Sequence, residues 1–298
     1  MATVPKVKIL MSTYNGAIFL QEQLESINKQ VGVDIDLFVR DDGSTDDTKS
    51  ILTSNDINLW PVEGGEGNLG PAKSFLQLIK SVNCEQYVAL ADQDDIWYSD
   101  KMLRAVTALK PFDSIPAMYC SNVNFYTGHQ SHSTNSNLPL PVLPLSLFQN
   151  SAMGCTIVFN NKAHQIIQQS SGHGMLMHDW YILLLILSTG KVIFDPIEGM
   201  LYRLHPNQAI GWKRKRSIWN VSSKDSFSSV LIQAQTIYLE FADQMTSESQ
   251  EIFKTIFQIR DAGIVKRCFL LFGGRLVLRR SFLENVWTKF RFLISSRA

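Results

Sequence analysis

The first 110 residues alternate short apolar runs with longer segments of helical periodicity. The apolar runs predict buried strands at 7–13, 35–39 and 87–91, with another near 57–61. Helices are expected between them, over about 17–29 and 71–82. Strands that alternate with helices indicate an α/β fold with a mostly parallel sheet. Later in the chain, strands are expected at 155–159, 191–194 and 200–203, and a buried helix over 178–188.

Polar clusters stand where three of these predicted strands end. They are Thr13-Tyr14-Asn15-Gly16, Asp41-Asp42-Gly43-Ser44 and Asp92-Gln93-Asp94-Asp95. In parallel α/β sheets, ligands bind beyond the carboxyl ends of the strands, because loops and helix N-termini converge there. We therefore expect the three clusters to build one ligand site.

Asp92 and Asp94 form a D-x-D pair directly after an apolar strand. Residues i and i+2 of an extended chain face the same side, so both carboxylates can meet one cation. Mn²⁺ or Mg²⁺ held there would neutralise the diphosphate of a sugar nucleotide as its glycosidic bond breaks. A turn that caps a helix near Ser99 is the alternative, but three acidic residues in four exceed what a cap requires.

The cluster around Asp41 and Asp42 admits three interpretations. A calcium loop fails, because its sixth position would be Asp47 instead of Gly and its twelfth Thr53 instead of Glu. A turn with a helix cap is credible. A strand-end carboxylate can also accept a hydrogen bond from the imide N–H of a pyrimidine, and we favour this role, with capping shared among the neighbours.

Four motifs occur in order: Ser12-Thr13-Tyr14-Asn15-Gly16, Asp41-Asp42-Gly43-Ser44-Thr45-Asp46, Asn68-Leu69-Gly70 and Asp92-Gln93-Asp94-Asp95-Ile96-Trp97. Together they resemble the signatures of family 2 inverting glycosyltransferases with the GT-A fold. The last motif is similar to the bacterial rhamnosyltransferase-like branch. The resemblance covers about residues 6–205. It implies metal-assisted single displacement from a dTDP- or UDP-sugar, with L-rhamnose suggested, to a saccharide or lipid-linked acceptor in surface polysaccharide (O-antigen-type) synthesis.

The resemblance also assigns roles to residues. Asp94 is the expected direct metal ligand, with Asp92 nearer the ribose and His205 approaching the metal or the diphosphate. Lys73 follows the Gly70 loop, where a solvated surface lysine is an equal alternative to a donor contact. The residues expected to bind the nucleotide-sugar are Thr13, Tyr14, Asn15, Asp41, Asp42, Asn68, Gly70, Lys73, Asp92, Gln93, Asp95 and Arg203.

An inverting transfer needs a general base on the acceptor side of the anomeric carbon. The segment Met177-His178-Asp179-Trp180 resembles the acidic motif of this family, and Asp179 is the predicted base. An Asp in the first turn of a helix is also favoured by the helix dipole alone. His178 is the weaker alternative. Tyr202-Arg203-Leu204-His205 resembles a later family segment, in which Arg203 would offset leaving-group charge.

Charge is distributed unevenly along the chain. The whole chain carries a net charge of +1, which argues against a nucleic-acid partner. Residues 260–298 carry +7, and Lys213-Arg214-Lys215-Arg216 precedes them. Cations interleaved with apolar residues suit a membrane interface, and a helical extension packed on the catalytic domain is the equal alternative. We expect a GT-A domain over 1–212, with a nucleotide-sugar half to about 110, and a helical basic extension over 213–298.

The four cysteines lie far apart in the sequence and form no C-x-x-C pair. With no signal peptide and no apolar stretch longer than Trp180–Leu187, we expect a cytoplasmic protein, peripheral at the inner face of the cell membrane. A haloacid-dehalogenase-type phosphatase also uses D-x-D, but its motif opens the fold. An inactive relative acting as a membrane-bound assembly factor is the non-enzymatic alternative, and intact metal and base positions count against it.

Overall fold

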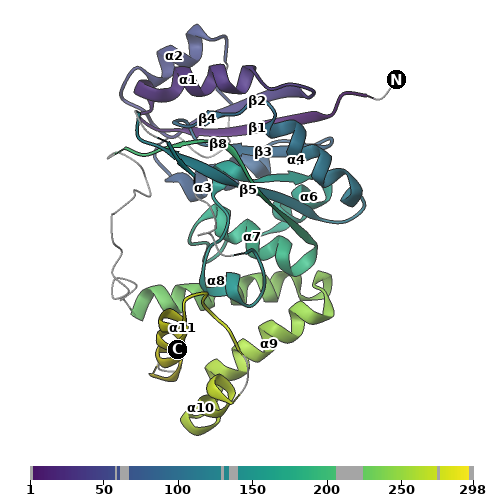
Figure 1. The fold of residues 1–298 in the computed structure, drawn as a ribbon, viewed down its shortest axis with the longest axis vertical. Coiled ribbons are helices and arrows are strands. Elements are labelled where there is room, and N and C mark those ends of the chain that lie inside the picture. Colours follow the sequence, from purple (N-terminus) through teal and green to yellow (C-terminus); the bar gives the residue numbers. More distant parts are fainter. Residues whose placement is uncertain are drawn as a thin grey trace.

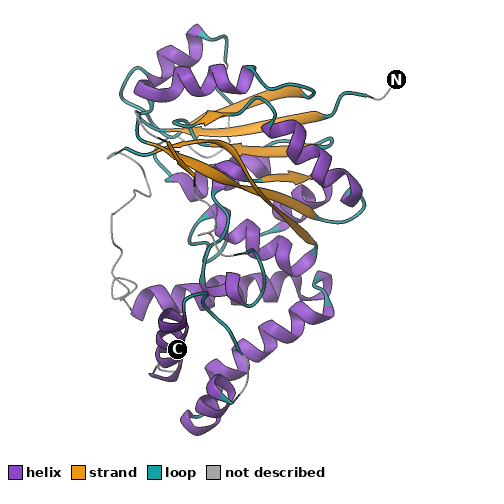
Figure 2. Ribbon diagram, in the orientation of Figure 1, coloured by secondary structure: helices purple, strands orange, loops and turns teal. Residues whose placement is uncertain are grey.

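A computed structural model describes residues 3–57, 59–60, 67–128, 131–133, 140–205, 224–273 and 276–294. Helices cover both faces of one sheet, and further helices extend from one side of that assembly (Figures 1 and 2). The predicted domain boundary at residue 212 and the cluster Lys213–Arg216 lie outside the described residues.

The sheet has the strand order β2-β1-β3-β7-β5-β8-β4, and β6 pairs with β5. Parallel pairing joins β1 to β2 and β3, and β5 to β8, while β7 and β4 run against their neighbours. Most strands of this order therefore run in one direction, as predicted. The strands are β1 (Lys6–Thr13), β2 (Asp34–Asp41), β3 (Tyr87–Ala91), β4 (Ile96–Trp97), β5 (Ala117–Tyr126), β6 (Ser131–Ser133), β7 (Val158–Asn160) and β8 (Lys191–Arg203).

Alternation along the strands separates two hydrophobic cores. Val7, Ile9 and Met11 of β1 join the core formed with α1, α2 and α4, whereas Leu10 faces the core formed with α3, α6 and α7. This period of two is what a strand covered on both faces requires. The helices are α1 (Ala17–Asn28), α2 (Thr48–Ser54), α3 (Pro71–Ser81), α4 (Lys101–Leu109), α5 (Leu145–Phe148), α6 (Asn161–Gln169), α7 (His178–Thr189), α8 (Lys224–Phe241), α9 (Ser247–Asp261), α10 (Ile264–Phe272) and α11 (Phe282–Ile294), with short 3-10 turns η1 (Lys110–Phe112), η2 (Gly154–Thr156) and η3 (Ala242–Gln244).

Two local predictions were wrong, and a third lies partly outside the described residues. Of the strand expected near 57–61, the described residues 57, 59 and 60 show one isolated bridge, between Val39 and Leu59. The strand expected at 155–159 begins at Val158, because Gly154–Thr156 forms a 3-10 turn. The two short strands expected at 191–194 and 200–203 are one strand, β8, whose pairing with β5 is interrupted by register shifts.

The C-terminal helices share a core with the helices that cover one face of the sheet. Phe227 and Ile237 of α8, Phe253 of α9 and Phe292 of α11 belong to the same buried cluster as α7. Thr246 also donates its backbone N–H to the carbonyl of Ser188 at 3.0 Å. The C-terminal helices therefore pack on the rest of the chain, as one of the two predicted alternatives had it. Within the part of the chain that the structure describes, no helix is both long and apolar enough to span a bilayer.

Candidate active site

Gln93 joins the loops that follow β1 and β3. Its amide oxygen accepts the backbone N–H of Tyr14 at 2.9 Å, and its amide nitrogen donates to the Tyr14 carbonyl at 2.9 Å. The side chain thus pairs with the backbone as a neighbouring strand would. A Cβ on Gly16 would overlap the Gln93 amide, so glycine is required for this close approach. Tyr14 itself is exposed at the edge of the site.

Asn15 joins the β1 loop to the loop after β2. Its backbone N–H donates to Ser44 Oγ at 2.9 Å, and its side-chain oxygen accepts the N–H of Thr45 at 2.8 Å. Asp41 fills the turn between them: its carboxylate accepts Thr13 Oγ1 at 3.0 Å and the Ser44 N–H at 2.8 Å, among other donors. Asp41 and Thr13 therefore hold this turn together, which is the structural role left open by the sequence.

Asp42 holds the loop before α3. Its carboxylate oxygens accept the backbone N–H groups of Leu69 and Gly70, both at 2.8 Å, and the buried guanidinium of Arg40 donates to it. Arg40 also donates to the Gly67 carbonyl at 3.3 Å. The Asp42 side chain is only 3% exposed, so direct contact with a base would require the Leu69–Gly70 backbone to move.

Asp94 and His205 lie in direct contact at the ends of β3 and β8. The His205 Nε2 atom is 2.7 Å from Asp94 Oδ2, and both side chains are largely buried. The other ring nitrogen of His205 is buried and meets no hydrogen-bond partner among the described residues. The structure thus brings together two residues, 111 positions apart, that were predicted to approach one metal.

Arg203 contacts the backbone of Asp94. Its Nε donates to the Asp94 carbonyl at 2.9 Å, its terminal nitrogen pairs with Glu22, and its guanidinium lies over the Phe19 ring at 4.7 Å. Its backbone N–H donates to Asp95 at 3.2 Å. These contacts orient the guanidinium toward the acidic loop. Arg203 therefore holds the backbone of Asp94 and the carboxylate of Asp95 in position.

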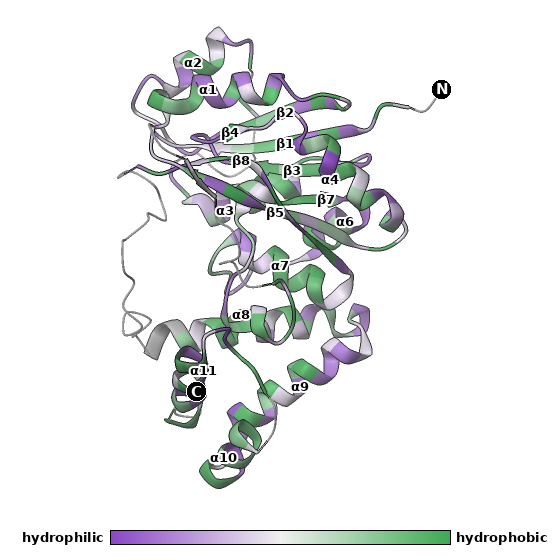
Figure 3. Ribbon diagram, viewed as in Figure 1, coloured by the Kyte–Doolittle hydropathy of each residue, from purple (hydrophilic) through white to green (hydrophobic). Residues whose placement is uncertain are grey.

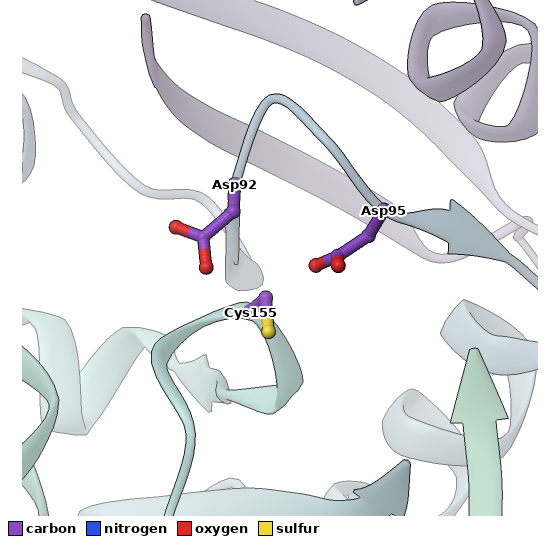
Figure 4. Close-up of side chains that lie close together, drawn as sticks. All are labelled: Asp92, Asp95 and Cys155. Atoms are coloured by element: carbon purple, nitrogen blue, oxygen red, sulfur yellow. The ribbon is translucent and has the colours of Figure 1, made fainter. Parts of the chain in front are cut away.

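A second acidic group lies beneath the loop. Asp92 and Asp95 project toward Cys155 of η2 (Figure 4), and their ligand atoms lie within 4.8 Å of one another. Burial raises the pKa of Asp95 and of the Cys155 thiol well above their usual ranges. A protonated thiol is a poor ligand, and both Mn²⁺ and Mg²⁺ favour oxygen donors over sulfur, so Asp94 with His205 is the better cation site.

Lys101 is the counter-charge to these carboxylates. It is buried, its Nζ donates to the Cys155 carbonyl at 2.7 Å, and it lies 3.2 Å from the centroid of the Trp97 ring. Burial lowers its pKa to about 7, against the opposing effects of Asp95 and Asp92. Burial, then the charges of Asp94 and Asp179, raise the pKa of Asp92 to about 7.

Asp179 lies at the first turn of α7, behind η2. A Cβ on Gly154 would come within 3.7 Å of the Asp179 Cβ, so the two backbones are in close contact. Burial raises the pKa of Asp179 to about 6, partly offset by the N–H of Trp180, which donates to its carboxylate at 2.6 Å. Because Asp179 also perturbs Asp92, the predicted base and the acidic loop share one electrostatic environment.

His178 is unsuited to the base role. Its ring stacks on Phe75 with 4.2 Å between centroids, and neither nitrogen meets a hydrogen-bond partner among the described residues. Burial lowers its pKa to about 3, which leaves a neutral side chain that packs in the core. Lys73 is exposed on α3, and no hydrogen bond or ion pair joins its side chain to another described residue.

Four features of the site were not predicted from the sequence. They are the contacts of Arg40, Glu22 and Lys101 and the contact of Cys155 with the carboxylates. A signal existed for Lys101, which is spaced i, i+4, i+8 with Ala105 and Leu109 on the buried face of α4. A cation at a core-facing helical position implies a buried partner. No comparable local pattern marks Glu22, whose partner Arg203 is 181 positions away, or Arg40, which contacts the nearby Asp42 but also the distant Ser74 and Gly67.

Comparison with known proteins agrees with this geometry. The family model described as glycosyl transferase family 2 matches residues 8–168, which is more than half of the chain. The chain belongs to glycosyl transferase family 2. The predicted family, and with it the class of inverting glycosyltransferases, is thereby confirmed.

Two named relatives are glycosyltransferases. A dTDP-rhamnosyl transferase, RfbG, of Shigella flexneri is 32% identical over 216 residues, which cover 67% of this chain and 73% of that protein. The UDP-Glc:alpha-D-GlcNAc-diphosphoundecaprenol beta-1,3-glucosyltransferase WfgD of Escherichia coli is 24% identical over 62% of this chain and 71% of its own length.

Two solved structures share the fold. TarS 1–349 of S. aureus, in complex with UDP, has a TM-score of 0.58 at 16% identity and covers 89% of this chain and 74% of its own. The mannosyltransferase PcManGT from Pyrobaculum calidifontis, in complex with GDP-Man and Mn²⁺, has a TM-score of 0.54 at 16% identity and covers 98% of this chain and 86% of its own. The predicted GT-A fold with C-terminal helices is confirmed.

Proposed function

We propose that this glycosyltransferase moves a sugar, L-rhamnose in the first instance, from a dTDP- or UDP-sugar to a saccharide or lipid-linked acceptor of bacterial surface polysaccharide synthesis. The observation that carries the proposal is the contact between Asp94 and His205 at the carboxyl ends of the strands. The names of the two relatives, RfbG and WfgD, support the nucleotides and the acceptor class.

The donor set at this point fits a divalent cation. A carboxylate oxygen and an imidazole nitrogen lie 2.7 Å apart and can both turn toward one ion. An imidazole in the set favours Mn²⁺ over Mg²⁺, which prefers oxygen ligands. Asp94 and His205 would hold the ion, which would supply charge stabilisation to the departing diphosphate. Arg203 keeps Asp94 in place through the Asp94 carbonyl.

The nucleotide side is assigned to the linked loops after β1 and β2. Tyr14 is exposed and its backbone is fixed by Gln93, so its ring can stack on a base. Asp42 keeps lone-pair capacity on Oδ2, whereas the Asp41 carboxylate is fully used by the turn. Of the two carboxylates left open by the sequence, the proposal therefore assigns Asp42 to the base, which it contacts once the Leu69–Gly70 backbone moves.

Asp179 is proposed as the general base. Its pKa of about 6 keeps it ionised at neutral pH and still basic enough to accept the proton of an acceptor hydroxyl as the sugar is transferred. Single displacement inverts the anomeric configuration, and no covalent intermediate is required. Cys155, buried with a protonated thiol, has no nucleophilic role in this scheme.

A donor screen tests the assignment. The melting temperature is measured with Mn²⁺ and dTDP-L-rhamnose, UDP-glucose or GDP-mannose, and the anomeric configuration of any product is determined. Stabilisation by a dTDP- or UDP-sugar and a product of inverted configuration are expected. Selective stabilisation by GDP-mannose, or retention of configuration, would contradict the proposal.

A further inference from the structure

The last two helices expose large apolar side chains to solvent. On α10 these are Ile264, Val265, Phe269 and Phe272, spaced at about one helical turn, and Val265 is 82% exposed. On α11 they follow the same spacing and are Phe282, Leu283, Val286, Trp287, Phe290 and Ile294. Figure 3 shows both helices as strongly hydrophobic at the end of the molecule away from the sheet. Exposed apolar stripes of this extent mark an interaction surface.

The opposite faces of both helices are firmly packed. Arg267 of α10 donates to the carbonyl of Phe292 on α11 at 2.9 Å and to that of Arg260 on α9 at 2.5 Å. Leu271 and Phe292 are fully buried in the core shared with α7. The orientation of the helices is therefore fixed, and the outward stripes are the faces left over after packing.

The positive charge of this surface indicates what kind of partner binds it. Among the described residues 262–294, Lys266 and Arg280 are exposed, Arg279 and Arg291 are partly exposed, and the one anion, Glu284, is partly exposed as well. A second copy of the chain would bring like charges face to face. An anionic bilayer offers both the apolar phase for the stripes and the counter-charge for the cations.

The surface is connected to the acceptor side of the site. Phe292 packs against Phe148 of α5 with 5.4 Å between ring centroids. The α5 carbonyl of Ser146 accepts the indole N–H of Trp180 at 2.6 Å, and Trp180 follows Asp179 directly. One short helix thus separates the exposed helices from the proposed base.

We propose that the outward faces of α10 and α11 dock on an anionic lipid bilayer and present the site to an acceptor carried by that bilayer. The docking itself rests on exposure and charge, and only the placement of the acceptor rests on the proposed function. Deleting residues 260–298 would be a poor test, because it also removes Leu271, Leu278 and Phe292 from the core.

The full-length chain is sedimented with vesicles of phosphatidylglycerol and phosphatidylcholine, and with phosphatidylcholine alone. Binding to the anionic vesicles is expected, with a partition coefficient reduced roughly tenfold or more in Phe269→Ser/Phe282→Ser and in Lys266→Glu. Two matched controls, Ile197→Ser and Lys110→Glu, change exposed residues on β8 and η1 and should bind as the wild type does.

Three results would overturn the docking proposal. They are no binding by the wild type, unchanged binding by the Phe269→Ser/Phe282→Ser variant, and a wild-type dimer without vesicles that becomes monomeric in that variant.

Unchanged melting temperatures verify that the variants fold. A blue shift of wild-type tryptophan fluorescence on vesicles that disappears in Trp287→Phe reports contact between α11 and the bilayer. Donor hydrolysis retained in a chain that does not bind vesicles would refute docking alone; vesicle binding without donor hydrolysis would refute the proposed function alone.

Discussion

Asp179 lies at the start of an apolar helix, where burial raises the pKa of its carboxyl to about 6. A base must be unprotonated, so kcat/KM is expected to fall as the pH falls through about 6. Asp179→Asn should lower kcat by about 10²–10⁴-fold and leave dTDP affinity unchanged. Steady-state kinetics and calorimetry check both. A tenfold loss of dTDP affinity with kcat intact would assign Asp179 to donor binding.

Asp179→Asn should raise the stability of the fold at high pH, although it lowers activity. Because the folded-state pKa of Asp179 lies above its ordinary value of 3.8, the ionised carboxylate destabilises the fold above about pH 6 and not below pH 4. Asp179→Asn should therefore have a higher melting temperature than the wild type at pH 8 and a similar one at pH 4. A lower melting temperature at pH 8 would mean that the carboxylate contributes net stability.

Lys101 is the residue whose removal should disturb the site most without touching the donor. Replacing it with Met leaves the buried Cys155 carbonyl without its donor and the Trp97 ring without the cation that lies over it. We expect Lys101→Met to lower the free energy of unfolding by about 1–3 kcal/mol, measured by urea denaturation at pH 6, where a pKa of about 7 leaves Lys101 charged. The exposed Lys110→Met is the control, and equal stability of the two variants would refute the role of Lys101.

At the scale of elements, the loops after β1, β2 and β3 act as one unit because side chains pair with backbone between them. Gly16→Ala tests the contact between Gln93 and the loop after β1. The φ of −104° at Gly16 suits alanine, and the three atoms nearest to an added Cβ all belong to the Gln93 amide. The variant should lose about 1–3 kcal/mol of unfolding free energy and weaken dTDP binding.

A double variant and a matched glycine make this prediction specific. Gly16→Ala in a Gln93→Ala background should cost little more than Gln93→Ala alone, because the overlap is gone. Gly263→Ala, where a Cβ meets no atom within 4 Å, should cost no more than about 0.5–1 kcal/mol, the preference of an N-cap for glycine over alanine, and should leave dTDP binding unchanged. Additive losses in the double variant would show that Gly16 is required for some other reason.

The elements that could be predicted from sequence are those with strong local periodicity. β3 matches its prediction at both ends, and α1, α3 and α7 differ by one residue at most. The strand expected at 155–159 was missed because η2 is shaped by tertiary contacts: Gly154 against Asp179 and the Cys155 carbonyl against Lys101. Motif order predicted that Asp94 and His205 lie together, as the structure has them, but not that Asp41, Thr13 and Gln93 connect loops.

At the scale of the whole molecule, the chain is a family 2 glycosyltransferase whose sheet presents the site at one edge and whose C-terminal helices share its larger core. Asp94 and His205, the donor pair proposed for a divalent cation, are in direct contact. The central claim is therefore that this pair makes nucleotide binding depend on metal.

Calorimetry with dTDP or UDP, with Mn²⁺ and with EDTA, tests that claim on the wild type, Asp94→Ala, His205→Ala and the exposed control Asp100→Ala. The wild type and the control are expected to bind at least about tenfold more tightly with Mn²⁺. The two site variants should lose that increment, and transfer rates should fall at least about 100-fold in Asp94→Ala. Asp94→Ala binding that still tightens with Mn²⁺ as in the wild type would contradict the account.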